Sequence, residues 1–224
     1  MEHAYRHAGY FLLASVPVFI AGFWIPYFSE IPHFDATITP AVHVHAILLF
    51  SWLVLLVFQP FAIRYRAVAL HRRLGKASMV LMTLIVPYAV AMLVKEYHEA
   101  VAAGAAIAAA RNGEMISAAQ LLVTVGAYVM AILSIRRRDV PAHMRYMLCT
   151  GIFLLPAGLT RTLGYWFGVR QVTGATVSAA AIEACLATLI LFDMRHKLNP
   201  GPYVRALAGY SLTVVVWLLL GRPV

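Results

Sequence analysis

The chain has 224 residues, of which 62% are hydrophobic and only 12% are charged, and its mean hydropathy is +0.79. A soluble domain of this length has too little interior to bury so much apolar surface, so the composition excludes an ordinary soluble globule and predicts an integral membrane protein. The formal net charge of +9 would suit a nucleic-acid ligand, but the placement of the basic residues predicts another cause.

Seven apolar stretches follow one another along the chain, each close to the ~20 residues that cross the hydrocarbon core of a bilayer as a helix. They cover Tyr10–Phe28, Ala41–Ile63, Lys76–Val94, Met115–Ile135, Tyr146–Phe167, Ala175–Phe192 and Tyr203–Leu220. None of them alternates apolar and polar residues as a barrel strand would. The sequence therefore predicts an all-α, polytopic bundle of seven transmembrane helices, organised as a single domain over residues 1–224.

Short connections separate these stretches. Arg64–Gly75 and Arg136–Pro141 are rich in arginine and predict two basic loops on one side of the membrane. Asn199–Pro202 predicts a tight turn before the last helix. The alanine-rich run Val101–Ala110 is too short to span, and we expect it either to extend the third helix or to lie at the membrane interface.

The basic residues are distributed unequally between the two sides of the predicted bundle. Most of the 18 lysine and arginine residues fall in segments on the same side as the amino terminus, and Arg161 lies inside a span. The opposite side carries Lys95, Arg111, Arg170 and Arg222. Cytoplasmic loops attract positive charge, so the pattern predicts a cytoplasmic amino terminus, an outside carboxyl terminus and a multi-pass location in the inner (plasma) membrane, with no nucleic-acid partner.

Two residues of opposite charge lie deep inside the predicted spans. Arg161 and Glu183 are on consecutive helices and have opposite charges. At 1.5 Å per residue, both lie roughly 10–12 Å below the outer surface. The matched depths predict a buried Arg161–Glu183 ion pair. Such a pair either belongs to a functional site or serves only to hold two helices together.

The second span carries a stripe of side chains at seven-residue intervals, formed by His45, Trp52 and Gln59. If this stripe faces the bundle, His45 joins the outer site near Arg161 and Glu183, and Gln59 points at an inner site. We predict this arrangement because His45 lies at the depth of the predicted ion pair, which favours a place in the outer site over a solvated position at the helix end.

A second group of polar residues is expected at the inner face. His71 precedes the third predicted span and His143 precedes the fifth, both near the depth of Gln59. Imidazoles from two helices can bind a haem iron, or contribute to a metal site together with a third ligand. The alternative is contact with anionic lipid headgroups beside the neighbouring arginines. No spacing in the chain supplies three ligands at one depth, so no metal centre is assigned from the sequence.

These residues occur in a wider pattern of motifs. His71-Arg72-Arg73-Leu74-Gly75-Lys76 is followed by Arg136-Arg137-Arg138-Asp139 and by His143-Met144-Arg145-Tyr146-Met147, and later helices carry Arg161 and Glu183. The chain resembles a broad bacterial family of multi-spanning membrane proteins classed as a domain of unknown function, over roughly residues 41–195. Arg138 replaces a more frequent glycine and Tyr146 a frequent tryptophan. The resemblance implies functional positions at His45, Gln59, His71, His143, Arg145, Arg161 and Glu183.

The histidine-bearing helices also resemble, distantly, those of b561-type cytochromes and membrane ferric reductases. The leading hypothesis is a membrane redox protein that binds haem b or a metal through His71 and His143, with His45 and Gln59 as further binding residues and a quinone as one conceivable partner. One alternative is a transporter of a small polar solute or of protons, with an outer polar cavity. Another is a non-catalytic assembly subunit. Enzymatic activity and oligomeric state are left open.

Overall fold

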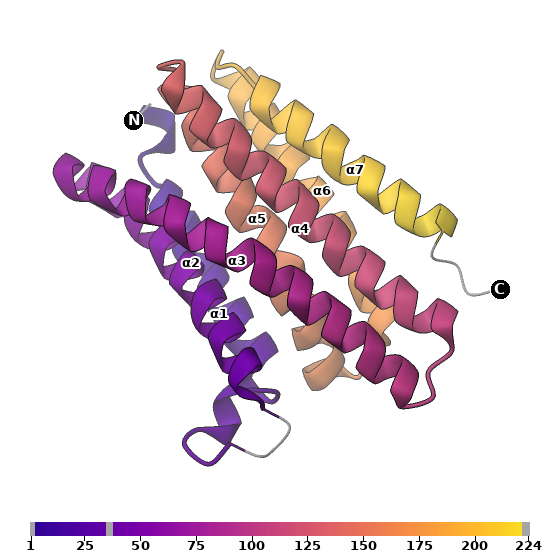
Figure 1. Cartoon of the computed structure of the whole chain (residues 1–224). Coiled ribbons are helices and arrows are strands. Elements are labelled where there is room, and N and C mark those ends of the chain that lie inside the picture. The colour runs from indigo at the N-terminus through magenta and orange to yellow at the C-terminus, as the bar shows by residue number, and fades with distance from the viewer. Residues whose placement is uncertain (1–2, 35–37, 221–224) are drawn as a thin grey trace.

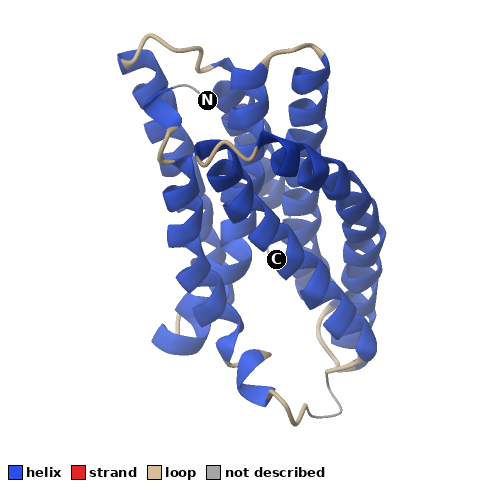
Figure 2. Cartoon of the chain, turned by 90° about the vertical axis from the view of Figure 1, so that its left-hand side faces the viewer, coloured by secondary structure: helices blue, strands red, loops and turns tan. Residues whose placement is uncertain are grey.

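The computed structural model describes residues 3–34 and 38–220, and it is built from long antiparallel helices (Figure 1). Among the described residues no strand is present (Figure 2). Arg222 of the predicted outer set lies outside the described residues. The elements in chain order are η1 (His3–Tyr5), α1 (Ala8–Trp24), η2 (Phe28–Glu30), α2 (Pro40–Arg64), α3 (Val68–Ala102), α4 (Ile107–Arg136), α5 (Val140–Phe167), α6 (Gln171–Arg195) and α7 (Gly201–Leu220).

Six of the helices, α2 to α7, are long and apolar enough to cross a membrane by their length and composition. Helix α1 is apolar too, but it has 17 residues and is shorter than the others. Large aliphatic side chains cover the outside of the bundle; Val80, Leu122 and Leu212 are each more than 60% exposed. Such a surface suits a hydrocarbon solvent and not water, so the prediction of an all-α, multi-pass membrane protein is confirmed.

Helix α5 lies at the centre of the bundle. It contacts α1, α4, α6 and α7, while α2 and α3 pack against each other and α3 reaches α4 (Figure 1). The core around it is apolar and includes Trp52, Leu56, Ile152, Phe153 and Leu186. Because the helices alternate in direction, the amino terminus and the turns 65–67, 137–139 and 196–200 gather at one end. We call it the basic end, since it carries most of the arginines.

The predicted basic loop Arg64–Gly75 is mostly helix, which corrects the sequence-based expectation. Helix α3 begins at Val68, so only residues 65–67 form the turn, and His71 lies on the second turn of a 35-residue helix. Alanine, leucine and arginine are good helix formers, and no proline interrupts them here. A high content of arginine is therefore not enough to predict a loop in this segment.

The alanine-rich run Val101–Ala110 extends α3 only through its first two residues. Helix α3 ends at Ala102 and α4 begins at Ile107, so the run is divided between the two helices. Gly104 adopts a left-handed backbone conformation with a φ of 86° in the turn between them. Glycine reaches this region without a Cβ clash, which explains why the chain reverses there.

Helices α1 and α5 approach each other closely at a pair of glycines. A Cβ atom added to Gly22 would lie 2.3 Å from the carbonyl oxygen of Gly158. Only a residue without a side chain fits this contact, so it brings α1 against the central helix.

Candidate functional site

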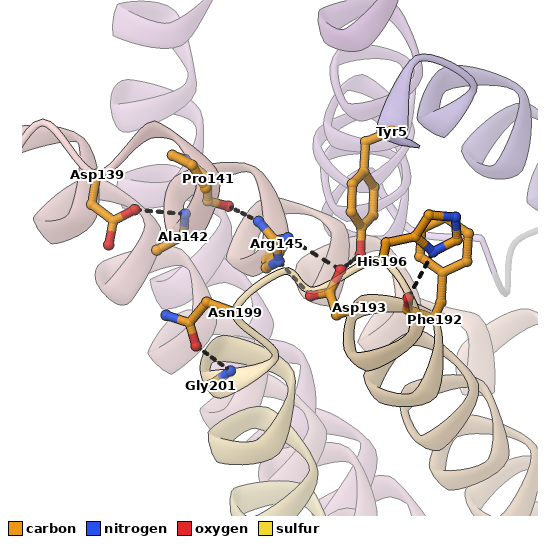
Figure 3. A network of polar contacts seen from close by, with 10 residues as sticks. All are labelled: Tyr5, Asp139, Pro141, Ala142, Arg145, Phe192, Asp193, His196, Asn199 and Gly201. Carbon is orange, nitrogen blue, oxygen red and sulfur yellow. Dashed lines mark hydrogen bonds and ion pairs between the residues drawn. The ribbon is translucent and has the colours of Figure 1, made fainter. Parts of the chain in front are cut away.

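The most deeply buried charges of the described chain lie at the basic end and join α5 to α6. Arg145 Nε lies 2.6 Å from Asp193 Oδ2, and Arg145 Nη2 donates to Asp193 Oδ1 at 3.1 Å (Figure 3). The two side chains are 1% and 0% exposed. Arg145 Nη1 also donates to the Pro141 carbonyl at 3.1 Å. This two-pronged geometry satisfies both oxygens of the carboxylate, which is what a buried ion pair requires.

The amino-terminal turn η1 completes this network through Tyr5. Its hydroxyl donates to Asp193 Oδ1 at 2.6 Å, and the Arg145 guanidinium lies 5.0 Å from the centre of its ring. Burial, together with the hydrogen bond to the Asp193 carboxylate, raises the pKa of Tyr5 above its ordinary value. The buried Tyr203 hydroxyl lies close to Tyr5 but makes no well-aligned hydrogen bond with the described residues. Tyr5, Arg145 and Asp193 form what we call the latch.

Sequence reasoning missed the latch because Asp193 lies one residue beyond the predicted sixth span. Arg145 was marked only through the family resemblance. A search for opposite charges at matched depths, extended to the first and last turns of each helix, would have paired Arg145 on α5 with Asp193 on α6. The latch joins helix ends and is closed to ligands, so we assign it a structural role.

The inner histidines predicted from the sequence come together beside the latch. Gln59 Nε2 donates to the His71 carbonyl at 3.4 Å, and the His71 imidazole lies close to the Gln59 carbonyl and within electrostatic range of His143. Two polar atoms of this group, Gln59 Oε1 and His71 Nδ1, are buried without a well-aligned hydrogen bond. Helices α2, α3 and α5 thus each contribute one member of what we call the histidine cluster, formed by Gln59, His71 and His143.

His143 is oriented by a neighbouring helix. Its Nδ1 lies 2.9 Å from the Ala131 carbonyl oxygen of α4. A carbonyl can only accept, so Nδ1 carries the proton and Nε2 keeps its lone pair. Imidazoles that bind metals are commonly held in this way, with the second nitrogen bonded to a carbonyl. The hydrogen bond therefore fixes the tautomer of His143 and leaves its Nε2 as the nitrogen that can accept.

Comparisons with models of known protein families, with curated proteins and with solved structures find no match for this chain. The geometry of its own residues therefore carries the functional argument.

The side chains of the histidine cluster suit a haem iron better than a structural zinc ion. The described residues contain no group of three or more His, Cys, Asp or Glu side chains that could hold a metal ion. Two imidazoles and one amide oxygen do not make the closed tetrahedral set of a structural zinc site. Two imidazoles could hold a haem b iron, which would supply one-electron redox chemistry.

The sequence also offers Trp52, Tyr88, Tyr165 and Trp166 as aromatic side chains that could pack against a flat macrocycle. Trp52 is 1% exposed and packs edge-on against Tyr128, with ring centres 5.3 Å apart. Tyr88, Tyr165 and Trp166 are 37%, 50% and 52% exposed and face outward.

The predicted Arg161–Glu183 ion pair is not formed between these two described residues. Arg161 Nη1 donates to the Ala157 carbonyl at 2.9 Å, and its guanidinium lies 5.0 Å from the Phe23 ring of α1. Glu183 instead accepts a hydrogen bond from Ser211 of α7 at 2.7 Å. The depths match, but Arg161 faces α1 and Glu183 faces α7, so the two side chains diverge.

His45 is the part of the predicted outer group that stays near Arg161. It lies within electrostatic range of the guanidinium. The stripe that contains His45 faces the bundle, because Trp52 and Gln59 are 1% and 9% exposed. His43 turns another way, with its Nδ1 2.9 Å from the Tyr27 hydroxyl. The structure thus separates His45 from the histidine cluster, of which Gln59 is a member.

Proposed function

We propose that this chain is a membrane redox protein that binds a transition metal, as haem b or as a metal ion, through His71 and His143. The observation that carries the proposal is the hydrogen bond from His143 Nδ1 to the Ala131 carbonyl, which leaves the Nε2 lone pair available, together with the electrostatic proximity of His143 to His71. A bound haem iron supplies reversible one-electron oxidation and reduction. His45 lies elsewhere and is not assigned to this site.

The residues around the two histidines suit such a centre. The cluster contains buried polar atoms on Gln59 and His71 without well-aligned partners, and unpaired buried polar atoms are costly unless a ligand engages them. Gln59 would orient the His71 backbone and supply an amide oxygen beside the metal. The exposed cations Arg72 and Arg73 follow His71 directly on α3 and would attract an anionic electron carrier or the propionates of a haem.

We also infer that all seven helices, α1 included, cross the plasma membrane of a bacterium, with the amino terminus in the cytoplasm and the carboxyl terminus outside. The concentration of arginines at the basic end supports this orientation. The motif pattern from His45 to Glu183 supports membership of the uncharacterised family that the sequence resembles. An accessible-cysteine assay with single cysteines in the turns 65–67 and 103–106 tests the orientation.

An oxidised-minus-reduced visible spectrum of the detergent-purified protein, with iron and other metals measured on the same sample, tests the redox function. We expect a reducible haem band or stoichiometric metal that is lost in His143→Gln and in His71→Gln. His196→Gln is the matched control, because His196 lies at the same end and its Nδ1 also contacts a backbone carbonyl, at 2.8 Å. A folded wild-type protein that is colourless and free of metal after expression with added haem and iron would overturn the proposal.

One observation favours a second candidate, an anion-binding site of a small-solute transporter. Arg161 is exposed, lies near His45 and has no carboxylate partner among the described residues. Uptake of small organic acids into vesicles, abolished by Arg161→Gln and kept in His143→Gln, would support this function instead. If neither a cofactor nor uptake is found, the assembly-subunit hypothesis remains, for which the latch between α5 and α6 provides the helix association.

A further inference from the structure

A groove on the membrane-facing surface lies between α3 and α4, which run side by side in opposite directions (Figure 1). Its volume is about 340 Å³, and its walls include Met79 and Thr83 of α3 and Val125, Val129 and Ile132 of α4. Ligand sites in proteins have volumes of about 300–1,000 Å³, so the groove is large enough to hold part of a lipid chain. None of these residues belongs to the latch or to the histidine cluster.

Apart from Arg136, the polar side chains in the walls of this groove are Thr83 and Tyr128, and both are hydrogen-bonded inside the protein. The Thr83 hydroxyl donates to the Met79 carbonyl of its own helix at 2.9 Å. The Tyr128 hydroxyl lies 3.0 Å from the Ser78 hydroxyl across the two helices. Because these two hydroxyls need no further polar partner, the length of the groove away from Arg136 suits a hydrocarbon chain, for which methionine and valine side chains are adaptable neighbours.

A positive charge closes the groove at the basic end. Val125, Val129, Ile132 and Arg136 follow one another at helical spacing, so the guanidinium stands at the end of the α4 wall. Lys76 precedes Met79 by three residues and continues the α3 wall in the same direction. Neither cation makes a hydrogen bond or an ion pair with any residue in the described part of the chain. The apolar groove thus ends in two unpaired cations at the depth of lipid headgroups.

We propose that the α3–α4 groove binds an anionic phospholipid, with an acyl chain along its walls and the phosphate between Arg136 and Lys76. The two unpaired cations provide charge complementarity for a phosphate, whereas a neutral isoprenoid quinone offers them no charge. The proposal does not depend on the redox function, since no residue of the histidine cluster takes part in it.

Binding of phosphatidylglycerol and of phosphatidylcholine to the purified full chain in detergent tests the proposal, with bound lipid counted by native mass spectrometry. We expect tighter binding of phosphatidylglycerol, weakened about 5-fold by Arg136→Gln, as expected for the loss of one basic residue near an anionic headgroup. Val129→Trp fills the groove and should weaken binding by roughly tenfold, through loss of buried chain methylenes. Met79→Trp fills it from the other wall if the first variant does not fold.

Matched controls separate this groove from general attraction to a basic surface. Arg195→Gln removes one exposed charge from the same end of α6, and Leu212→Trp adds a tryptophan to the exposed face of α7. Both should bind phosphatidylglycerol like the wild type. Equal affinity for the two lipids, an equal loss in Arg136→Gln and Arg195→Gln, or a neutral ubiquinone analogue that displaces phosphatidylglycerol would each overturn the proposal.

Discussion

Charged residues have different bonding partners at the two ends of the bundle. At the basic end, Arg145 and Asp193 are fully buried and bonded to each other, and Asp193 also accepts a hydrogen bond from Tyr5. In the opposite half, Arg161 and Glu183 share no bond, and each takes a neutral partner on a neighbouring helix or on its own. A charged residue inside a predicted span is therefore not by itself a sign of a buried ion pair, because the bonded pair of this protein lies at the helix ends.

The largest effect should come from breaking the latch. Asp193→Ala leaves the Arg145 guanidinium buried without its carboxylate, and removal of one partner of a buried pair costs about 3–5 kcal/mol. We expect a strong loss of folded protein, measured by thermal unfolding in detergent. Glu183→Ala removes a carboxylate of the opposite half that is bonded to one hydroxyl, and should cost about 1 kcal/mol. Equal losses in the two variants would contradict the contrast between the two ends.

A smaller effect is expected from Tyr5→Phe, which removes the hydroxyl and keeps the ring beneath Arg145. The lost hydrogen bond to a charged acceptor predicts a loss of about 1.5–3 kcal/mol at neutral pH. The raised pKa of Tyr5 adds a pH dependence. The contribution of Tyr5 to the free energy of unfolding is complete below a pH of about 10, which is the pKa of a tyrosine in the unfolded chain. This contribution is lost as the pH rises beyond that value, because the phenol ionises first in the unfolded chain.

Unfolding measured at pH 8 and at pH 10.5 checks this dependence. The difference in stability between the wild type and Tyr5→Phe should shrink at the higher pH. A difference that grows with pH would mean that the Tyr5 phenol is not held in its neutral form by the fold.

The smallest effect is the coupling between Arg161 and Glu183. Since the two side chains face different helices, the losses caused by Arg161→Ala and Glu183→Ala should add within about 0.3–0.5 kcal/mol in a double-mutant cycle. The same cycle on Arg145 and Asp193 should give a coupling well above 1 kcal/mol. Strong coupling between Arg161 and Glu183 would restore the ion pair predicted from the sequence and remove the contrast.

The sequence predicted the helices well because hydropathy reports directly on the solvent of each segment. It grouped His71 and His143 correctly at one end, since helix direction alternates and both precede a span. It failed on Arg161 and Glu183 because residue counting gives depth along a helix and not the rotation of one helix against another. It missed Asp193 because this residue is the first one beyond the predicted sixth span. It misplaced the start of α3 because a basic stretch can still be a good helix former.

The latch has a consequence for how the chain is made. Tyr5 and Asp193 are 188 positions apart in the chain. Tyr5 can therefore reach its carboxylate only after the sixth helix has been made, whereas Arg145 is made with the fifth. The hydrogen bond from Tyr5 to Asp193 thus forms only when α5 and α6 are both in place, and it marks the completed assembly of the basic end.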